Sequence, residues 1–227
     1  MRNLIQVLFL YSAASCSAIE EGPPPQDARP FLSYDIRYGL HCKPATGLLE
    51  CLREHEPINV PTGRSEPIRR DNRLCLSSHP EATCFIDQEG LGYTLLENSG
   101  KTLLVIETEV HGGFSVIIID SETGLSRRVD NRPLPSIAGG LFATVSYDTD
   151  AGYLPNRVVI WDENRHIAVY QFTDFAVGQG PTGIRWDGPS RLEVRYSRQP
   201  QTPESDNSDT FFIYKDKDGN WTNNYNS

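Results

Sequence analysis

Short apolar runs dominate the chain after Cys84. They are rich in Val, Ile, Phe, Tyr and Thr, and Gly, Asn or Asp bounds nearly every run. This pattern is typical of β-strands joined by turns, and no long window carries an apolar face at the period of a helix. The sequence therefore predicts an all-β protein of antiparallel strands.

Three stretches share one plan, in which two strand-like runs end at an aspartate and a turn follows. They comprise residues 101–106 with 114–120, 140–146 with 157–162, and 191–196 with 210–216, and residues 74–76 with 84–87 look like a shorter fourth copy. The first two aspartates lie 42 residues apart, close to the roughly 40 to 45 residues of a four-stranded propeller blade. We expect four-stranded, blade-like repeats in an incomplete or small β-propeller-like stack of sheets. A simple meander of hairpins would give the same even spacing.

Part of this pattern resembles a known group of proteins. Residues 134–146 resemble the turn and first strand of a blade in secreted bacterial propellers, with residues 136–139 in place of the usual Ser-Pro-Asp-Gly turn. Residues 156–162 resemble a later strand of such a blade, and residues 147–156 are similar to a loop of uncharacterised exported bacterial proteins of this type. The resemblance covers about residues 91–198 and implies a fold rather than a function.

The N-terminus has the order of a secretory signal. Arg2 precedes an apolar stretch, and small residues follow up to Ala18, which predicts a signal peptide over residues 1–18. Cleavage after Ala18 and lipidation of Cys16 both remain open from these residues. We therefore expect a periplasmic or secreted bacterial protein, with a lipid anchor if Cys16 is modified.

The rest of the chain is expected to form one domain behind a tether. Residues 19–30 contain three consecutive prolines, which favour a stiff linker. The domain then spans residues 31–227, with a disulfide-containing portion over 31–90 and the repeats over 91–227. No apolar run is long enough to predict a transmembrane helix.

If the chain is exported, its cysteines are expected to form disulfides. The mature chain keeps four, which in an oxidising compartment predicts two disulfides with three possible pairings. Cys75 and Cys84 lie in neighbouring strand-like runs, so a hairpin would place them opposite each other. The favoured pairing is therefore Cys75 with Cys84, which leaves Cys42 with Cys51. A zinc site is the alternative, but the spacings do not match a zinc knuckle.

The net charge of the chain argues against one class of partner, nucleic acids. The formal net charge is −9, which opposes binding to a phosphate backbone, so no nucleic acid partner is predicted. The only basic cluster contains Arg64, Arg69, Arg70 and Arg73, and we expect it to be a solvated loop.

The loop over residues 147–156 is the candidate binding site. It offers two aromatic side chains among acidic and amide groups, a composition that suits contact with a protein. Its candidate residues are Tyr147, Asp148, Asp150, Tyr153 and Asn156. The sequence thus predicts a noncatalytic binding module with a protein partner, in one version a periplasmic inhibitor or immunity-type protein. Alternatively, the loop is an ordinary connection whose tyrosines pack on the sheet.

An enzyme is the second class of function. A hydrolase of cell-wall or glycan substrates would use carboxylates such as Glu107, Glu109, Asp148 and Asp150, but no motif anchors any pair of them. Residues 178–183 match a dinucleotide fingerprint, yet the following residues predict a strand where that motif requires a helix. No catalytic residue, cofactor or metal site is therefore predicted.

Overall fold

The computed structural model describes residues 31–33, 47–57, 67–76, 83–99, 101–109, 113–148, 155–197 and 208–226. In these residues the chain forms sixteen strands and one helix, and the strands make four antiparallel sheets. The all-β prediction is confirmed. The predicted signal peptide, the possible lipidation site Cys16 and the tether over 19–30 lie outside the described residues.

The four sheets follow the order of the chain. The first contains β2 (Ile68–Arg70), β3 (Arg73–Leu76) and β4 (Thr83–Ile86). The second contains β5 (Leu91–Asn98), β6 (Thr102–Glu109), β7 (Phe114–Asp120) and β8 (Ser126–Val129). The third contains β9 (Leu134–Pro135), β10 (Leu141–Ser146), β11 (Arg157–Asp162) and β12 (Ile167–Phe172). The fourth contains β13 (Gly180–Trp186), β14 (Arg191–Ser197), β15 (Ser208–Lys215) and β16 (Trp221–Asn223), with β1 (Leu32–Ser33) beside β13.

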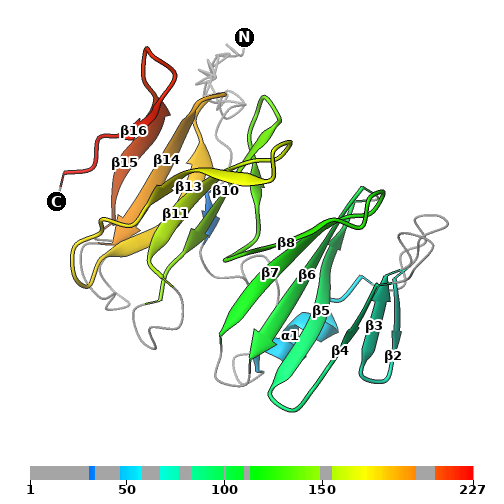
Figure 1. Cartoon of the computed structure of the whole chain (residues 1–227). Helices are drawn as coiled ribbons and strands as arrows, with labels where there is room; N and C mark the ends of the chain where they lie inside the picture. The colour runs from blue at the N-terminus through cyan, green and yellow to red at the C-terminus, as the bar shows by residue number, and fades with distance from the viewer. Residues whose placement is uncertain are drawn as a thin grey trace, which may run out of the picture.

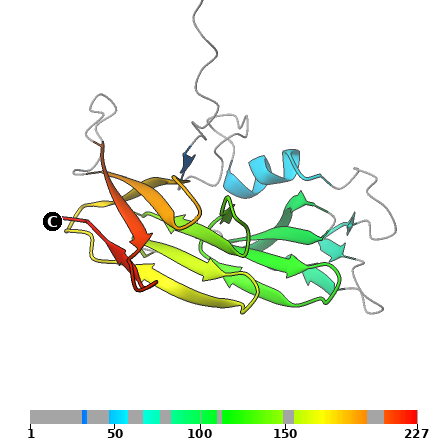
Figure 2. The same ribbon diagram turned by 90° about the horizontal axis from the view of Figure 1, so that it is seen from above.

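The predicted repeats are present as consecutive meanders. The strand pairs β6/β7, β10/β11 and β14/β15 form the centre of the second, third and fourth sheets. The sheets follow one another in a row, from β2–β4 to β13–β16, and none closes on itself (Figure 1, Figure 2). The incomplete, blade-like stack is therefore confirmed. The helix α1 (Leu48–Glu54) packs beside β5.

Apolar side chains between neighbouring sheets hold the row together. Leu74 and Leu76 of the first sheet pack with Val105 and Ile117 of the second. Phe142 of the third sheet packs on the second sheet, and a larger cluster that includes Trp186 joins the third sheet to the fourth. β14 alternates between buried and exposed residues, but other inner strands are buried on both faces, as in β6, where six consecutive residues are buried. This explains why these strands have continuous apolar sequences instead of alternating ones.

The aspartates at the ends of the repeats close tight turns. The Asp120 carboxylate accepts hydrogen bonds from the backbone N–H groups of Glu122 (2.9 Å) and Thr123 (2.7 Å). Asp162 accepts one from the N–H of Arg165 (2.9 Å). Asp216 accepts bonds from two N–H groups in the last turn. An Asp at this position is favoured because its short side chain reaches the backbone two to four residues ahead.

The stabilising effect of the Asp120 carboxylate depends on pH. The N–H and hydroxyl of Thr123 hold the pKa of Asp120 below its ordinary value of 3.8. A lowered folded-state pKa stabilises the protein above the unfolded value, and this contribution is lost as the pH falls through the folded value. We expect Asp120→Asn to lower the free energy of unfolding by about 1 kcal/mol at pH 7. Urea unfolding should show the difference from wild type shrinking below about pH 4; a constant difference from pH 7 to pH 3 would contradict the role of the carboxylate.

The two ends of the stack are built differently. β6, β10 and β14 run toward one end, the lower end in Figure 1, which we call the loop end. The aspartate-closed turns lie at the opposite end, which we call the turn end. At the loop end, the connections between β10 and β11 and between β12 and β13 are longer. The sheets therefore form a frame that has its longer connections at one end.

The first described residues attach the N-terminal segment to the last sheet. Leu32 pairs with Ile184, and β1 runs antiparallel to β13 from the turn end. The Phe31 ring lies under the guanidinium groups of Arg185 (4.5 Å) and Arg195 (4.2 Å), contacts that stabilise by cation–π attraction. The chain thus enters this sheet from the turn end.

Candidate functional site

The predicted loop over residues 147–156 has a well-fixed base. Asn156 Oδ1 accepts a hydrogen bond from the Asp148 N–H (2.9 Å), and Asn156 Nδ2 donates to the Gln179 carbonyl (3.2 Å). The Tyr147 ring is buried, 7% exposed, and packs on the backbone at Gly180. Tyr147 and Asn156 therefore act as structural residues at the base of the loop, joining it to the start of β13. Asp150 and Tyr153 lie outside the described residues.

A second feature of the loop end is the turn between β12 and β13, residues 173–179. The Gln179 N–H donates to the Ala176 carbonyl (2.9 Å), and Gly178 has a φ of 77°. This left-handed φ favours glycine. Val177 at the tip is fully exposed. This turn was not predicted as a site from the sequence, although the apolar pair Ala176 and Val177 before Gly178 is a signal that could have indicated it.

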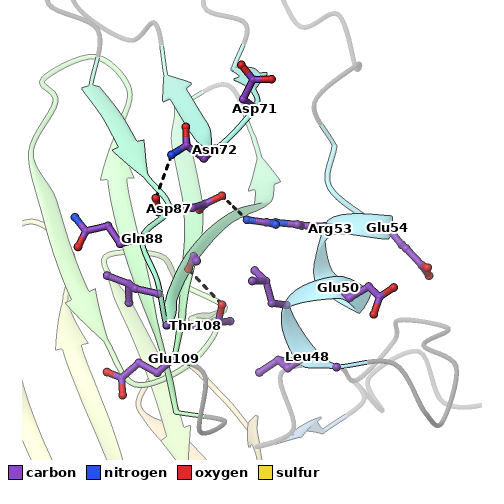
Figure 3. Close-up of a pocket in the computed structure, with 15 residues that line it drawn as sticks. Leu48, Glu50, Arg53, Glu54, Asp71, Asn72, Asp87, Gln88, Thr108 and Glu109 are labelled. Carbon is purple, nitrogen blue, oxygen red and sulfur yellow. Dashed lines mark hydrogen bonds and ion pairs between the residues drawn. The ribbon is translucent and has the colours of Figure 1, made fainter.

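A groove of about 980 Å³ lies at the loop end, between α1 and the first residues of β5. Gly92 lets the helix approach β5, because a Cβ there would lie 2.6 Å from Leu49 Cδ2. The groove has six charged lining residues, Glu50, Arg53, Glu54, Asp71, Asp87 and Glu109. Arg53 reaches across to Asp87, whereas Glu50 and Glu54 point away from the strands (Figure 3). Carboxylates thus outnumber cations around the groove.

A buried network of charged groups lies beside this groove. Arg69 of β2 makes two hydrogen bonds to the Glu56 carboxylate, at 2.6 and 2.9 Å, and a weaker one to Asp87 at 3.3 Å. Glu56 also accepts a hydrogen bond from the Leu95 N–H (2.7 Å). Burial lowers the pKa of Arg69, but the bonds and charge of Glu56 outweigh it and raise the pKa overall. Arg69 is therefore part of a structural network that joins β2, the end of α1 and β5.

The basic cluster is not a loop, because Arg69 and Arg70 belong to β2 and Arg73 belongs to β3, although Arg70 and Arg73 are exposed to solvent as expected. Arg64 lies outside the described residues. The partners of Arg69 are 13 and 18 residues away in the sequence. Sequence spacing alone gives no signal for such contacts.

Two of the four carboxylates suggested for hydrolysis, Glu107 and Glu109, have different surroundings. Glu107 is 7% exposed and pairs with Arg128 (2.7 Å) and more weakly with the Ser115 hydroxyl (3.4 Å). Burial, together with a hydrogen bond to Glu107, raises the pKa of Tyr93. Glu109 is exposed at the end of β6. Glu107 is thus engaged in a local network, and Glu109 alone of the two faces solvent.

The predicted Cys75–Cys84 disulfide is confirmed. The two residues are direct cross-strand partners on β3 and β4, and their Cα atoms lie 4.1 Å apart. Cys51, on α1, is also disulfide-bonded. The second expected bridge, Cys42 with Cys51, involves Cys42, which lies outside the described residues.

Among the residues that the structure describes, no three His, Cys, Asp or Glu side chains form a group that could hold a metal ion. Within these ranges, no helix has the length and hydropathy needed to cross a bilayer.

No family model matches this chain, and no curated protein sequence is similar to it. Function must therefore be inferred from the geometry of the loop end.

Proposed function

We propose that this chain is an exported, noncatalytic binding module that recognises a protein partner through its loop end. The observation that carries this proposal is the difference between the two ends of the stack. The turn end has short turns closed by Asp120, Asp162 and Asp216. The longer connections gather at the loop end on a rigid frame, the usual arrangement of binding loops on a scaffold.

The direction of β1 supports recognition through the loop end. The chain enters β1 from the turn end, beside Arg185 and Arg195. A tether over residues 19–30, with or without a lipid at Cys16, would then join the module at the turn end. The loop end would face away from the point of attachment and toward a partner.

An inhibitor or immunity-type protein is the specific version of this function. The base of the 147–156 loop is held by Asn156 and Tyr147 before any partner binds. A base that is fixed before binding loses less conformational entropy on binding, which raises affinity. The net charge of −9 and the carboxylates around the groove favour a partner with a basic face.

The alternative, a carboxylate-dependent hydrolase, has weaker support. It needs two carboxylates that both face a substrate. In the described part of the chain, Glu107 is engaged by Arg128 and buried. Binding is therefore the function that the geometry favours.

The test is a pull-down from periplasmic extract with the mature chain, residues 19–227, tagged at its N-terminus. We expect one protein to be recovered in stoichiometric amount. A variant with residues 149–154 replaced by an equal length of Gly and Ser should lose it, whereas a control with residues 217–219 replaced at the turn end should retain it. Circular dichroism checks that both variants fold. Recovery of no stoichiometric protein, or equal loss with both variants, would contradict the proposal.

A further inference from the structure

The apolar tip of the 173–179 turn is the most exposed apolar feature of the described residues. Val177 has a relative exposure of 105%, whereas the next most exposed large apolar residue, Leu125, has 58%. Ala176 and Gly178 on either side are also exposed, so the tip carries no polar side chain. A turn at the surface usually contains polar residues or glycine, and nothing in the fold requires an aliphatic side chain at this tip.

The turn is held in place although the Val177 side chain at its tip is fully exposed. Phe175 packs edge-on against Phe172, with ring centroids 4.9 Å apart, and lies in an aromatic cluster that includes Tyr225 (5.7 Å). The Tyr225 hydroxyl donates to Gln179 Oε1 (2.7 Å). Asn156 holds the Gln179 carbonyl from the neighbouring loop. Contacts from the C-terminal segment and from the 147–156 loop thus fix both sides of the turn below Val177.

A rigid, convex turn with an aliphatic tip fits a concave apolar site. Burying one such side chain in a desolvated pocket is favourable because apolar area leaves water. The rigidity of the turn reduces the entropy lost on binding. Anchor residues that fill a pocket on the partner contribute most of the affinity of many interfaces. A single exposed apolar residue needs no functional explanation. Val177 is different because it lies on a fixed turn at the loop end.

We infer that Val177 is an anchor residue that inserts into an apolar pocket, of a size for one aliphatic side chain, on the protein partner. This inference rests on the proposed function and names the contact that recognition uses. Asp174, exposed in the same connection, would lie near the rim of that pocket. The pocket therefore has an apolar floor and a rim that is neutral or basic.

The experiment compares two exposed aliphatic residues in similar turns. Leu125 is the matched control, because it follows Gly124, another glycine with positive φ (71°), but lies at the turn end. The probe is the protein recovered by the wild-type chain, purified, and its affinity is measured by calorimetry. We expect Val177→Asp to weaken binding by about a hundredfold or more and Val177→Ala by about tenfold. Leu125→Asp should change affinity by less than about twofold.

A third variant tests the rigidity of the turn. Tyr225→Phe removes the hydroxyl that donates to Gln179 and keeps the ring in the aromatic cluster. We expect about fivefold weaker binding with Val177 intact. Thermal unfolding of all variants checks that each is folded at the temperature of the binding experiment.

The outcomes separate this inference from the proposed function. A stoichiometric partner whose affinity is unchanged by Val177→Asp would overturn the anchor role and leave the binding function intact. Equal losses for Val177→Asp and Leu125→Asp would also overturn it. If no stoichiometric partner is recovered, the proposed function and this inference both fail.

Discussion

Replacing Glu56 by alanine should lower the free energy of unfolding by about 2–3 kcal/mol. The Glu56 side chain is only 3% exposed and the Arg69 side chain 16% exposed. Without the carboxylate, the Arg69 guanidinium loses both short hydrogen bonds and the Leu95 N–H loses its acceptor. The Arg69 charge then keeps only its weaker pair with Asp87 and its bond to the Tyr93 carbonyl, and the Leu95 donor is unsatisfied, which destabilises the contact between the first two sheets. Urea unfolding at pH 7 measures the loss.

A double variant provides the control for this prediction. Glu56→Leu with Arg69→Met replaces the whole ion pair by apolar groups of similar size, which in other buried pairs is often close to neutral. We expect it to recover only part of the stability lost in Glu56→Ala, because the Leu95 N–H still lacks its acceptor and the Tyr93 carbonyl loses its donor. If Glu56→Ala unfolds within about 0.5 kcal/mol of wild type, the range usual for surface changes, the network does not hold the first sheet to the second.

Gly180→Ala should destabilise the protein by about 2–3 kcal/mol through overpacking. A Cβ at this position would overlap the buried Tyr147 ring and lie 3.1 Å from Asn156 Cγ. The ring is confined by the base of the 147–156 loop, so it has little room to move. The same denaturation experiment gives the change.

A double-mutant cycle identifies the ring as the cause. Tyr147→Ala alone should cost about 3–5 kcal/mol, because it empties a buried site. The double variant Tyr147→Ala with Gly180→Ala should be more stable than the sum of the two changes predicts, since the new methyl group then occupies part of the vacated space. Additive losses would contradict a direct contact between Gly180 and the ring.

The sequence was most informative about the central strands. The strands around Val105, Ile117 and Val159 were predictable because their apolar residues are continuous and bounded by turn residues, and the strand around Val194 because its apolar residues alternate with more exposed polar ones. The turns after Asp120, Asp162 and Asp216 were predictable because their geometry is set by local hydrogen bonds. The Cys75–Cys84 bridge followed from the same hairpin.

Features that depend on distant contacts were not predictable. The helix α1 has only seven residues, too few for an apolar period to stand out. The pairing of Leu32 with Ile184 joins residues more than a hundred positions apart. The burial of Arg69 depends on Glu56, which no spacing rule connects to it. In the candidate site, the loop was predictable, but the role of Tyr147 depends on the close approach allowed by Gly180.

The most direct test of binding at the loop end is hydrogen exchange of the complex with the purified partner. Backbone N–H groups that become buried in an interface exchange more slowly. We expect the strongest additional protection in residues 147–156 and 173–179, with no change in residues 121–125, 163–166 and 216–220. Protection confined to those turns, with none at the loop end, would contradict the proposed recognition surface.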